Sequence, residues 1–97
     1  MAVKHKITAS TSIKTGYTKL VGFLIATNGS DDPIITVFDD AANTAGTEVV
    51  PTNTYDASAL GLNGAWFGHE GAIECQVGVY VEVADLGVGG YVLVYVN

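Results

Sequence analysis

The chain has 97 residues, which is enough for one small domain and excludes a second domain, a dinucleotide-binding unit with a substrate domain, and a (β/α)8 barrel. Val, Ile and Thr make up 29 of the 97 residues and Gly another 12, a composition that favours short strands joined by tight turns. A net charge of −6 repels phosphate backbones and argues against nucleic-acid binding. We therefore predict an all-β fold for residues 1–97: a single small antiparallel β-sandwich or jelly-roll-like barrel.

The basic residues are confined to the first nineteen positions of the chain. All four are lysines, and the ten acidic residues lie further along, between Asp31 and Glu82. We therefore predict that residues 1–19 form a basic N-terminal arm that docks on an acidic partner, or an edge segment on which lysines discourage aggregation. The four lysines, taken as hypothetical contacts to such a partner, are Lys4, Lys6, Lys14 and Lys19.

Turn signals divide the first half of the chain into three predicted strands. Asn28-Gly29 supplies the positive φ of a reversal, and Pro33 fixes the entry to the following strand. The first strand is apolar on both faces and should therefore be central and covered on both sides. The third contains Pro51, which cannot donate to a ladder, so it should be an edge strand or change sheets at a bend. The three strands cover residues 17–27, 34–39 and 48–56.

The second half of the chain contains a glycine-rich stretch and two alternating strands. Residues 57–71, with Trp66-Phe67, are predicted to be irregular. Residues 73–84 alternate with their valines on one face, which predicts one strand with one buried face. Residues 91–96 alternate Val with Tyr and Leu, so both faces of that strand are apolar. The proximity of the last two strands predicts a hairpin.

A chain this small rarely covers both faces of two apolar strands with its own residues, and partner surface is a common remedy. We therefore predict a homo-oligomer with an obligate interface of about 2,000 Å² or more. The aromatic pair 66–67, flanked by glycines, is an interface anchor, a sugar-stacking platform or a loop plug over the end of the sandwich. The hypothetical oligomer or partner interface consists of Trp66, Phe67, Tyr91, Leu93 and Tyr95.

Motifs that could carry chemistry are incomplete in this sequence. The glycines of residues 87–90 join two predicted strands and lack the helix that would hold a pyrophosphate. His69-Glu70 has no second histidine at the spacing of a zinc-protease helix, and the two Asp pairs lack the spacing of a calcium loop. Cys75 falls on the valine face and is predicted to be a small buried hydrophobe. We expect no enzyme, no cofactor and no metal site.

The single cysteine rules out an intramolecular disulfide, which favours synthesis in a reducing cytoplasm. The longest apolar run, residues 20–26, is far short of the roughly 20 residues of a spanning helix. The first residues also lack the apolar core of a signal peptide. We therefore expect no membrane partner.

The order of several segments resembles that in small virion proteins of tailed bacteriophages. In those proteins a strand ending in an "sNGs" turn leads to a "TVxD" strand and then to a "GtxvxP" segment. Here the corresponding residues are 17–30 (YTKLVGFLIATNGS), 34–39 (IITVFD) and 46–51 (GTEVVP), followed by a glycine-rich stretch before the final strands. The resemblance implies a compact β-sandwich that binds the outside of a capsid, usually as a trimer, as a decoration or cement protein without catalytic residues.

The resemblance therefore implies a structural virion protein that binds the major capsid protein on the outer capsid surface, stabilises the shell as a homotrimer, and is made in the host cytoplasm. Two alternatives remain open. One is a carbohydrate- or receptor-binding module that uses Trp66, Phe67 and the loop acids. The other is a tail or head-completion subunit that forms rings through its edge strands.

Overall fold

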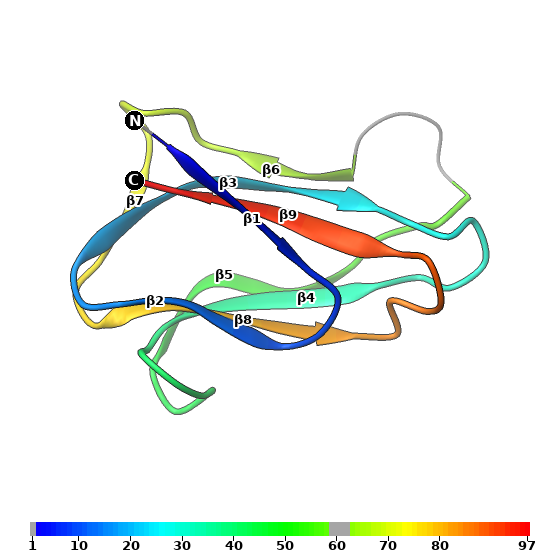
Figure 1. The fold of residues 1–97 in the computed structure, drawn as a ribbon, viewed down its shortest axis with the longest axis horizontal. Coiled ribbons are helices and arrows are strands. Elements are labelled where there is room, and N and C mark those ends of the chain that lie inside the picture. Colours follow the sequence, from blue (N-terminus) through cyan, green and yellow to red (C-terminus); the bar gives the residue numbers. More distant parts are fainter. Residues whose placement is uncertain (1, 59–62) are drawn as a thin grey trace.

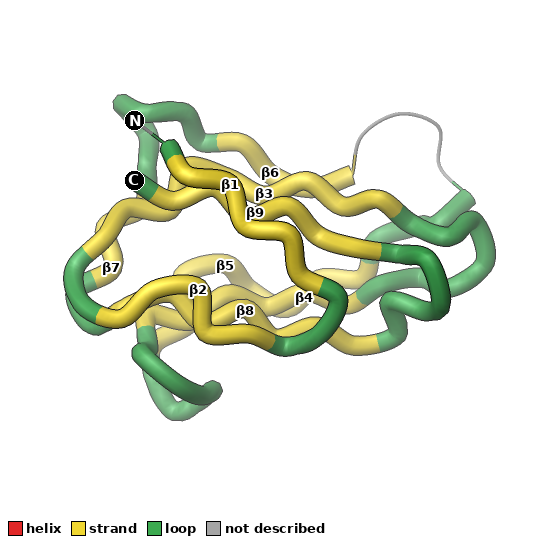
Figure 2. Tube along the Cα trace, viewed as in Figure 1, coloured by secondary structure: helices red, strands yellow, loops and turns green. Residues whose placement is uncertain are grey.

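Two antiparallel sheets face each other and enclose the core (Figures 1 and 2). The structure is a computed structural model that describes residues 2–58 and 63–97. The strands of the described chain are β1 (Val3–Ile7), β2 (Thr11–Thr15), β3 (Thr18–Ala26), β4 (Ile34–Asp39), β5 (Thr47–Thr54), β6 (Asn63–Trp66), β7 (Ile73–Cys75), β8 (Gly78–Ala84) and β9 (Tyr91–Val96). The expected all-β sandwich is thereby confirmed.

The strand order in the two sheets is that of a jelly roll. Sheet A has the order β1-β9-β3-β6, with β7 also paired to β3, and sheet B has the order β2-β8-β4-β5. The connections β1 to β2, β2 to β3, β3 to β4 and β8 to β9 all pass from one sheet to the other. In the described chain the two sheets share one core, and the edge strands are β1, β6 and β7 in sheet A and β2 and β5 in sheet B.

The core lies between the sheets and is built from the alternating residues that face inward. On β9 the three valines are buried while the tyrosines and leucine between them are half-buried, as the alternation predicts. Ile35 and Val37 of β4 face the same core from sheet B. Central members of the core are Leu20, Phe23, Ile25, Ile35, Val37, Cys75, Val79, Val81, Val92, Val94 and Val96.

Both the central strand and the proline strand lie where the sequence predicts. β3 pairs with β9 on one side and with β6 and β7 on the other, so it is central. β5 is the edge of sheet B, and its pairing with β4 shifts register between Ile35 and Val37, near Pro51. The basic segment 1–19 supplies an edge strand to each sheet, β1 to sheet A and β2 to sheet B.

The prediction of one continuous strand over residues 73–84 is wrong. The chain bends at Gln76 and Val77, so that β7 belongs to sheet A and β8 to sheet B. Val77 is consequently 53% exposed instead of joining the buried valine face. The carboxylate of Asp39, at the end of β4, accepts the backbone N–H groups of residues 76, 77 and 78 at 3.0, 2.8 and 3.2 Å and so satisfies the donors of the bend.

Two further predictions about the second half of the chain are wrong. β8 and β9 do not form a hairpin, because residues 85–90 carry the chain from sheet B to sheet A. β9 instead lies between β1 and β3, so it is not an exposed edge. Within residues 57–71, which the sequence suggests are irregular, residues 63–66 form β6 against β3, and residues 59–62 lie outside the described part of the chain.

Candidate interaction surface

The outer face of sheet A carries a continuous set of large apolar side chains. Gly22 of β3 pairs with Trp66 of β6 on one side and with Tyr95 of β9 on the other, and Tyr95 pairs in turn with Lys4 of β1. The next outward row contains Gly64, Leu24, Leu93 and Lys6, and beyond it Tyr91 lies opposite Ala26. We call the large apolar residues of these rows the aromatic face: Leu24, Trp66, Tyr91, Leu93 and Tyr95.

Gly22 makes the aromatic contact of this face possible. A Cβ atom at Gly22 would lie 2.6 Å from Cε3 of Trp66, so the indole ring lies directly over the glycine. With no side chain between them, the rings of Trp66 and Tyr95 meet edge to face, with centroids 5.0 Å apart and planes at 75°. An aromatic side chain that covers a strand glycine in this way compensates for the packing the glycine lacks. Trp66 nevertheless remains 55% exposed.

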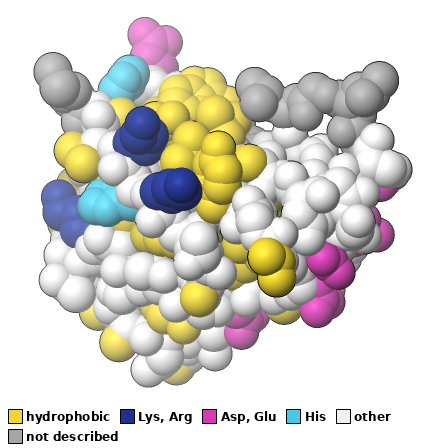
Figure 3. All heavy atoms as spheres, turned by 45° about the vertical axis from the view of Figure 1, so that its right-hand side comes forward, with side chains coloured by type: hydrophobic (Ala, Val, Ile, Leu, Met, Phe, Trp, Pro, Cys, Tyr) yellow, Lys and Arg dark blue, Asp and Glu magenta, His cyan; other side chains and the backbone are white. Residues whose placement is uncertain are grey.

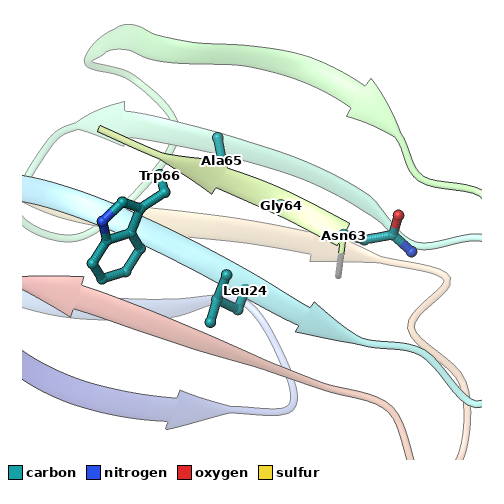
Figure 4. Close-up of a pocket in the computed structure, with 5 residues that line it drawn as sticks. All are labelled: Leu24, Asn63, Gly64, Ala65 and Trp66. Carbon is teal, nitrogen blue, oxygen red and sulfur yellow. The ribbon is translucent and has the colours of Figure 1, made fainter. Parts of the chain in front are cut away.

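A hollow of about 220 Å³ lies beside the indole (Figure 4). Leu24 lies between Trp66 and Asn63 in its lining. Gly64 pairs with Leu24, and a Cβ atom at Gly64 would collide with the backbone oxygen of Phe23, so the close approach of β6 to β3 requires glycine there. The Asn63 amide donates to the carbonyl of Asp56 at 3.2 Å, which helps to fix that wall. Small-molecule sites usually enclose about 300–1,000 Å³, so this hollow better suits one protruding side chain or a stacked ring.

Lysine side chains border the aromatic face at the β1 edge. Lys4 and Lys6 alternate outward along β1, opposite Tyr95 and Leu93. The ammonium of Lys6 lies 4.4 Å from the centroid of the Tyr91 ring, a cation–π contact. Figure 3 shows this arrangement as a group of hydrophobic side chains with lysines next to it. The surface therefore combines an apolar centre with a cationic border.

The structure brings together most, but not all, of the residues that the sequence assigns to contacts. Lys14 lies on β2 in sheet B, and Lys19 pairs with Glu74 near the other end of β3, so the four lysines do not form one patch. Phe67 packs against the core and does not share the open face of its neighbour Trp66. Trp66 itself belongs to a strand, so it is not a loop plug.

Leu24 and the two strand glycines belong to the site, although the sequence did not identify them. The apolar outer face of residues 17–27 was the available signal for Leu24. The role of Gly22 and Gly64 depends on which residues lie across from them, and pairing with β6 cannot be read from β3 alone.

The cysteine of the described chain lies in the core, and His69 lies on the surface. Cys75 is fully buried, as expected, and burial, with a smaller contribution from the charge of Asp39, raises the pKa of its thiol to about 11. The thiolate, the nucleophilic form, is therefore scarce at neutral pH. His69 is exposed in the segment between β6 and β7. No group of three or more metal-ligating side chains occurs among residues 2–58 and 63–97.

Comparisons with protein-family models, with curated proteins and with solved structures find no match to this chain. In the part of the chain that the structure describes, no helix has the length and apolarity needed to traverse a bilayer. The candidate site is therefore defined by its own geometry: a contact surface on sheet A.

Proposed function

We propose that this chain is a structural virion protein that binds the major capsid protein on the outer surface of a tailed-phage capsid and reinforces the shell as a homo-oligomer. The observation that carries the proposal is the aromatic face with its lysine border. An exposed Trp packed on Tyr and Leu side chains is typical of the centre of a protein interface, where such residues dominate binding energy. The resemblance of roughly residues 17–97 to phage virion proteins suggests the setting.

The fold supports the same proposal, although less specifically. Jelly rolls occur in viral capsid proteins and in lectins, so the architecture fits a virion protein without selecting one. Its two sheets pack their inner faces around one core, and the large side chains on the outer face of sheet A remain partly exposed. A rigid block of this kind can bridge neighbouring capsomers, so that rupture of a pressurised shell must also break the added contacts. Linked copies would strengthen attachment by about 10²–10⁴ over a single site.

Co-sedimentation with assembled shells tests the proposal. The chain should be co-expressed with the major capsid protein encoded beside its gene, and shells should then be separated from free protein by sedimentation. We expect the chain in the shell fraction. Assembled shells without bound chain, or a gene with no capsid gene in its neighbourhood, would contradict the proposal.

Replacing the four lysines by alanine should weaken shell attachment roughly tenfold or more at low salt, because each exposed ion pair contributes about 0.2–1 kcal/mol. The difference between this variant and the natural chain should shrink as salt rises, because exposed charges are screened. Replacement of the same lysines by arginine is the matched control and should preserve attachment. Equal binding by the alanine variant across a salt titration would eliminate the electrostatic contribution.

A sugar-binding module is the second candidate, favoured by the hollow beside Trp66. The indole could stack on a sugar ring that rests against Leu24. Because Trp66 is the single tryptophan, a bound glycan would quench or shift its fluorescence directly. Saturable quenching by a glycan series that is absent with unrelated small solutes would favour this candidate over shell binding.

A further inference from the structure

The rows across sheet A have different chemistry at their two ends. At the β1 edge the rows begin with Lys4 and Lys6. At the β6 edge the same rows end with the ring of Trp66 and with the hollow at Gly64. Between the two edges lie only the apolar side chains of β9 and β3. The β1 edge therefore presents two ammonium groups, and the β6 edge presents the indole face of Trp66 and the hollow beside it.

We propose that a second copy of this chain covers the aromatic face, with two sheets A packed face to face around a two-fold axis. The axis runs parallel to the strands, between β9 and β3. Such a rotation exchanges the β1 and β6 edges while leaving each row at its own level along the strands. Lys4 of one copy then lies over Trp66 of the other, and Lys6 lies over the other copy's hollow. Both contacts occur twice, as two-fold symmetry requires.

The chemistry of both ends favours this pairing. Tryptophan is the best aromatic partner for a lysine ammonium, and Trp66 has more than half of its surface open to receive one. The contact between Lys6 and Tyr91 within one chain shows that an ammonium of β1 already lies against a ring on this face. The hydrocarbon stem of a lysine can cover Leu24 in the hollow while its charge remains at the rim.

The centre of the face fits a second sheet. Sheets pack face to face about 10 Å apart when large apolar side chains interdigitate between them. Tyr95, Leu93 and Leu24 are half-buried in one chain and would complete their burial against their symmetry mates. Interfaces between identical subunits are more apolar than other interfaces, and the side chains that β9 and β3 contribute to these rows carry no charge. These features favour a second copy over a foreign partner. If a second copy covers the aromatic face, the dimer must bind a shell through another surface, so the inference shares with the proposed function only the premise that the face is a contact surface.

Light scattering after size exclusion measures the number of chains directly. We expect the mass of two chains at high concentration and dissociation toward one chain on dilution. Trp66, the single tryptophan, reports on the same interface. Its emission should shift to the blue and lose access to iodide in the dimer, and both changes should reverse on dilution.

Matched lysine variants test the geometry. Lys4→Ala should weaken dimerisation about 5–30-fold, because each dimer loses two cation–π pairs. Lys14→Ala, which removes the same charge from β2 in sheet B, should leave dimerisation unchanged. Trp66→Leu keeps an apolar side chain but removes the ring, and it should abolish the difference between the Lys4 variant and its parent.

Three results would overturn the inference: one chain at every concentration with Trp66 accessible to iodide, the mass of a trimer, or equal losses from the Lys4 and Lys14 variants. Shell sedimentation keeps this test separate from that of the proposed function. A dimer that does not bind shells upholds this inference and refutes the proposed function. A monomer that binds shells refutes this inference and upholds shell binding, but not the homo-oligomeric form of the proposed function.

Discussion

Replacing Phe23 by alanine should cost about 3–5 kcal/mol of unfolding free energy, which is a large part of the roughly 5–15 kcal/mol expected of a small domain. Phe23 lies at the centre of β3 and is completely buried. Its ring meets that of Tyr55, the residue that follows β5 of sheet B, edge to face with centroids 6.2 Å apart. The neighbouring strands hold their positions through backbone pairing, so the cavity can close only in part.

Leu24→Ala is the matched control, because it shortens the next side chain on the same strand. Leu24 lies on the outer face and is only half-buried, so we expect a loss of roughly 1 kcal/mol in the monomer. Association through the aromatic face should weaken instead. Urea unfolding at low protein concentration measures the first effect for both variants, and light scattering measures the second. Equal losses of stability would contradict the assignment of the two side chains to opposite faces.

The sequence specified which face a residue would take more reliably than which sheet its strand would join. In β9 the alternation of Val with Tyr and Leu correctly separates core from surface. The same kind of alternation in residues 73–84 does not predict the bend that separates β7 from β8. That bend depends on Asp39, which lies more than thirty residues earlier in the chain. A local pattern carries no information about such a partner.

The candidate site was predicted in part for a similar reason. Lys4 and Lys6 were expected to contact one partner surface, while Trp66, Tyr91, Leu93 and Tyr95 were expected to contact another. The pairing of β1 with β9, and of β9 with β3, places both sets on one face. The sequence distance between β1 and β9 hides this neighbourhood, because strand order in a sheet is fixed by long-range contacts.

The second large effect concerns Asp39, which holds the bend between the sheets. Burial alone would raise the pKa of this carboxyl, but hydrogen bonds from the backbone N–H groups of Val77, Gln76 and Gly78 outweigh it and hold the pKa below its ordinary value. Asn in place of Asp39 would keep one acceptor oxygen and turn an amide donor toward these N–H groups. We expect Asp39→Asn to cost roughly 2–3 kcal/mol at neutral pH, because hydrogen bonds to a charged group contribute more than neutral ones.

The pH dependence of stability follows from the direction of that shift. A carboxyl whose pKa is lower in the folded than in the unfolded state binds fewer protons when folded, so it contributes stability above its unfolded pKa of about 3.9. This contribution disappears as the pH falls through the folded pKa. The same direction holds for Asp40 and Asp56, whose pKa values are lowered mainly by hydrogen bonds from Ala42 and Ser58, respectively. Acid should therefore destabilise the natural chain more steeply than the Asp39→Asn variant.

Urea midpoints measured from neutral pH to about pH 3 test this expectation. The stabilities of the natural chain and of the Asp39→Asn variant should converge as the pH falls. Glu82→Gln supplies the matched control, because it removes one negative charge from an exposed position on β8. At higher pH the stability of the Glu82→Gln variant should stay close to that of the natural chain, whereas the Asp39→Asn variant should be clearly less stable than both. If the Asp39 and Glu82 variants gave the same curve, net charge would explain the acid response, and the three hydrogen bonds of the bend would not. Different curves for the two variants would identify Asp39 as the group whose protonation destabilises the bend between the two sheets.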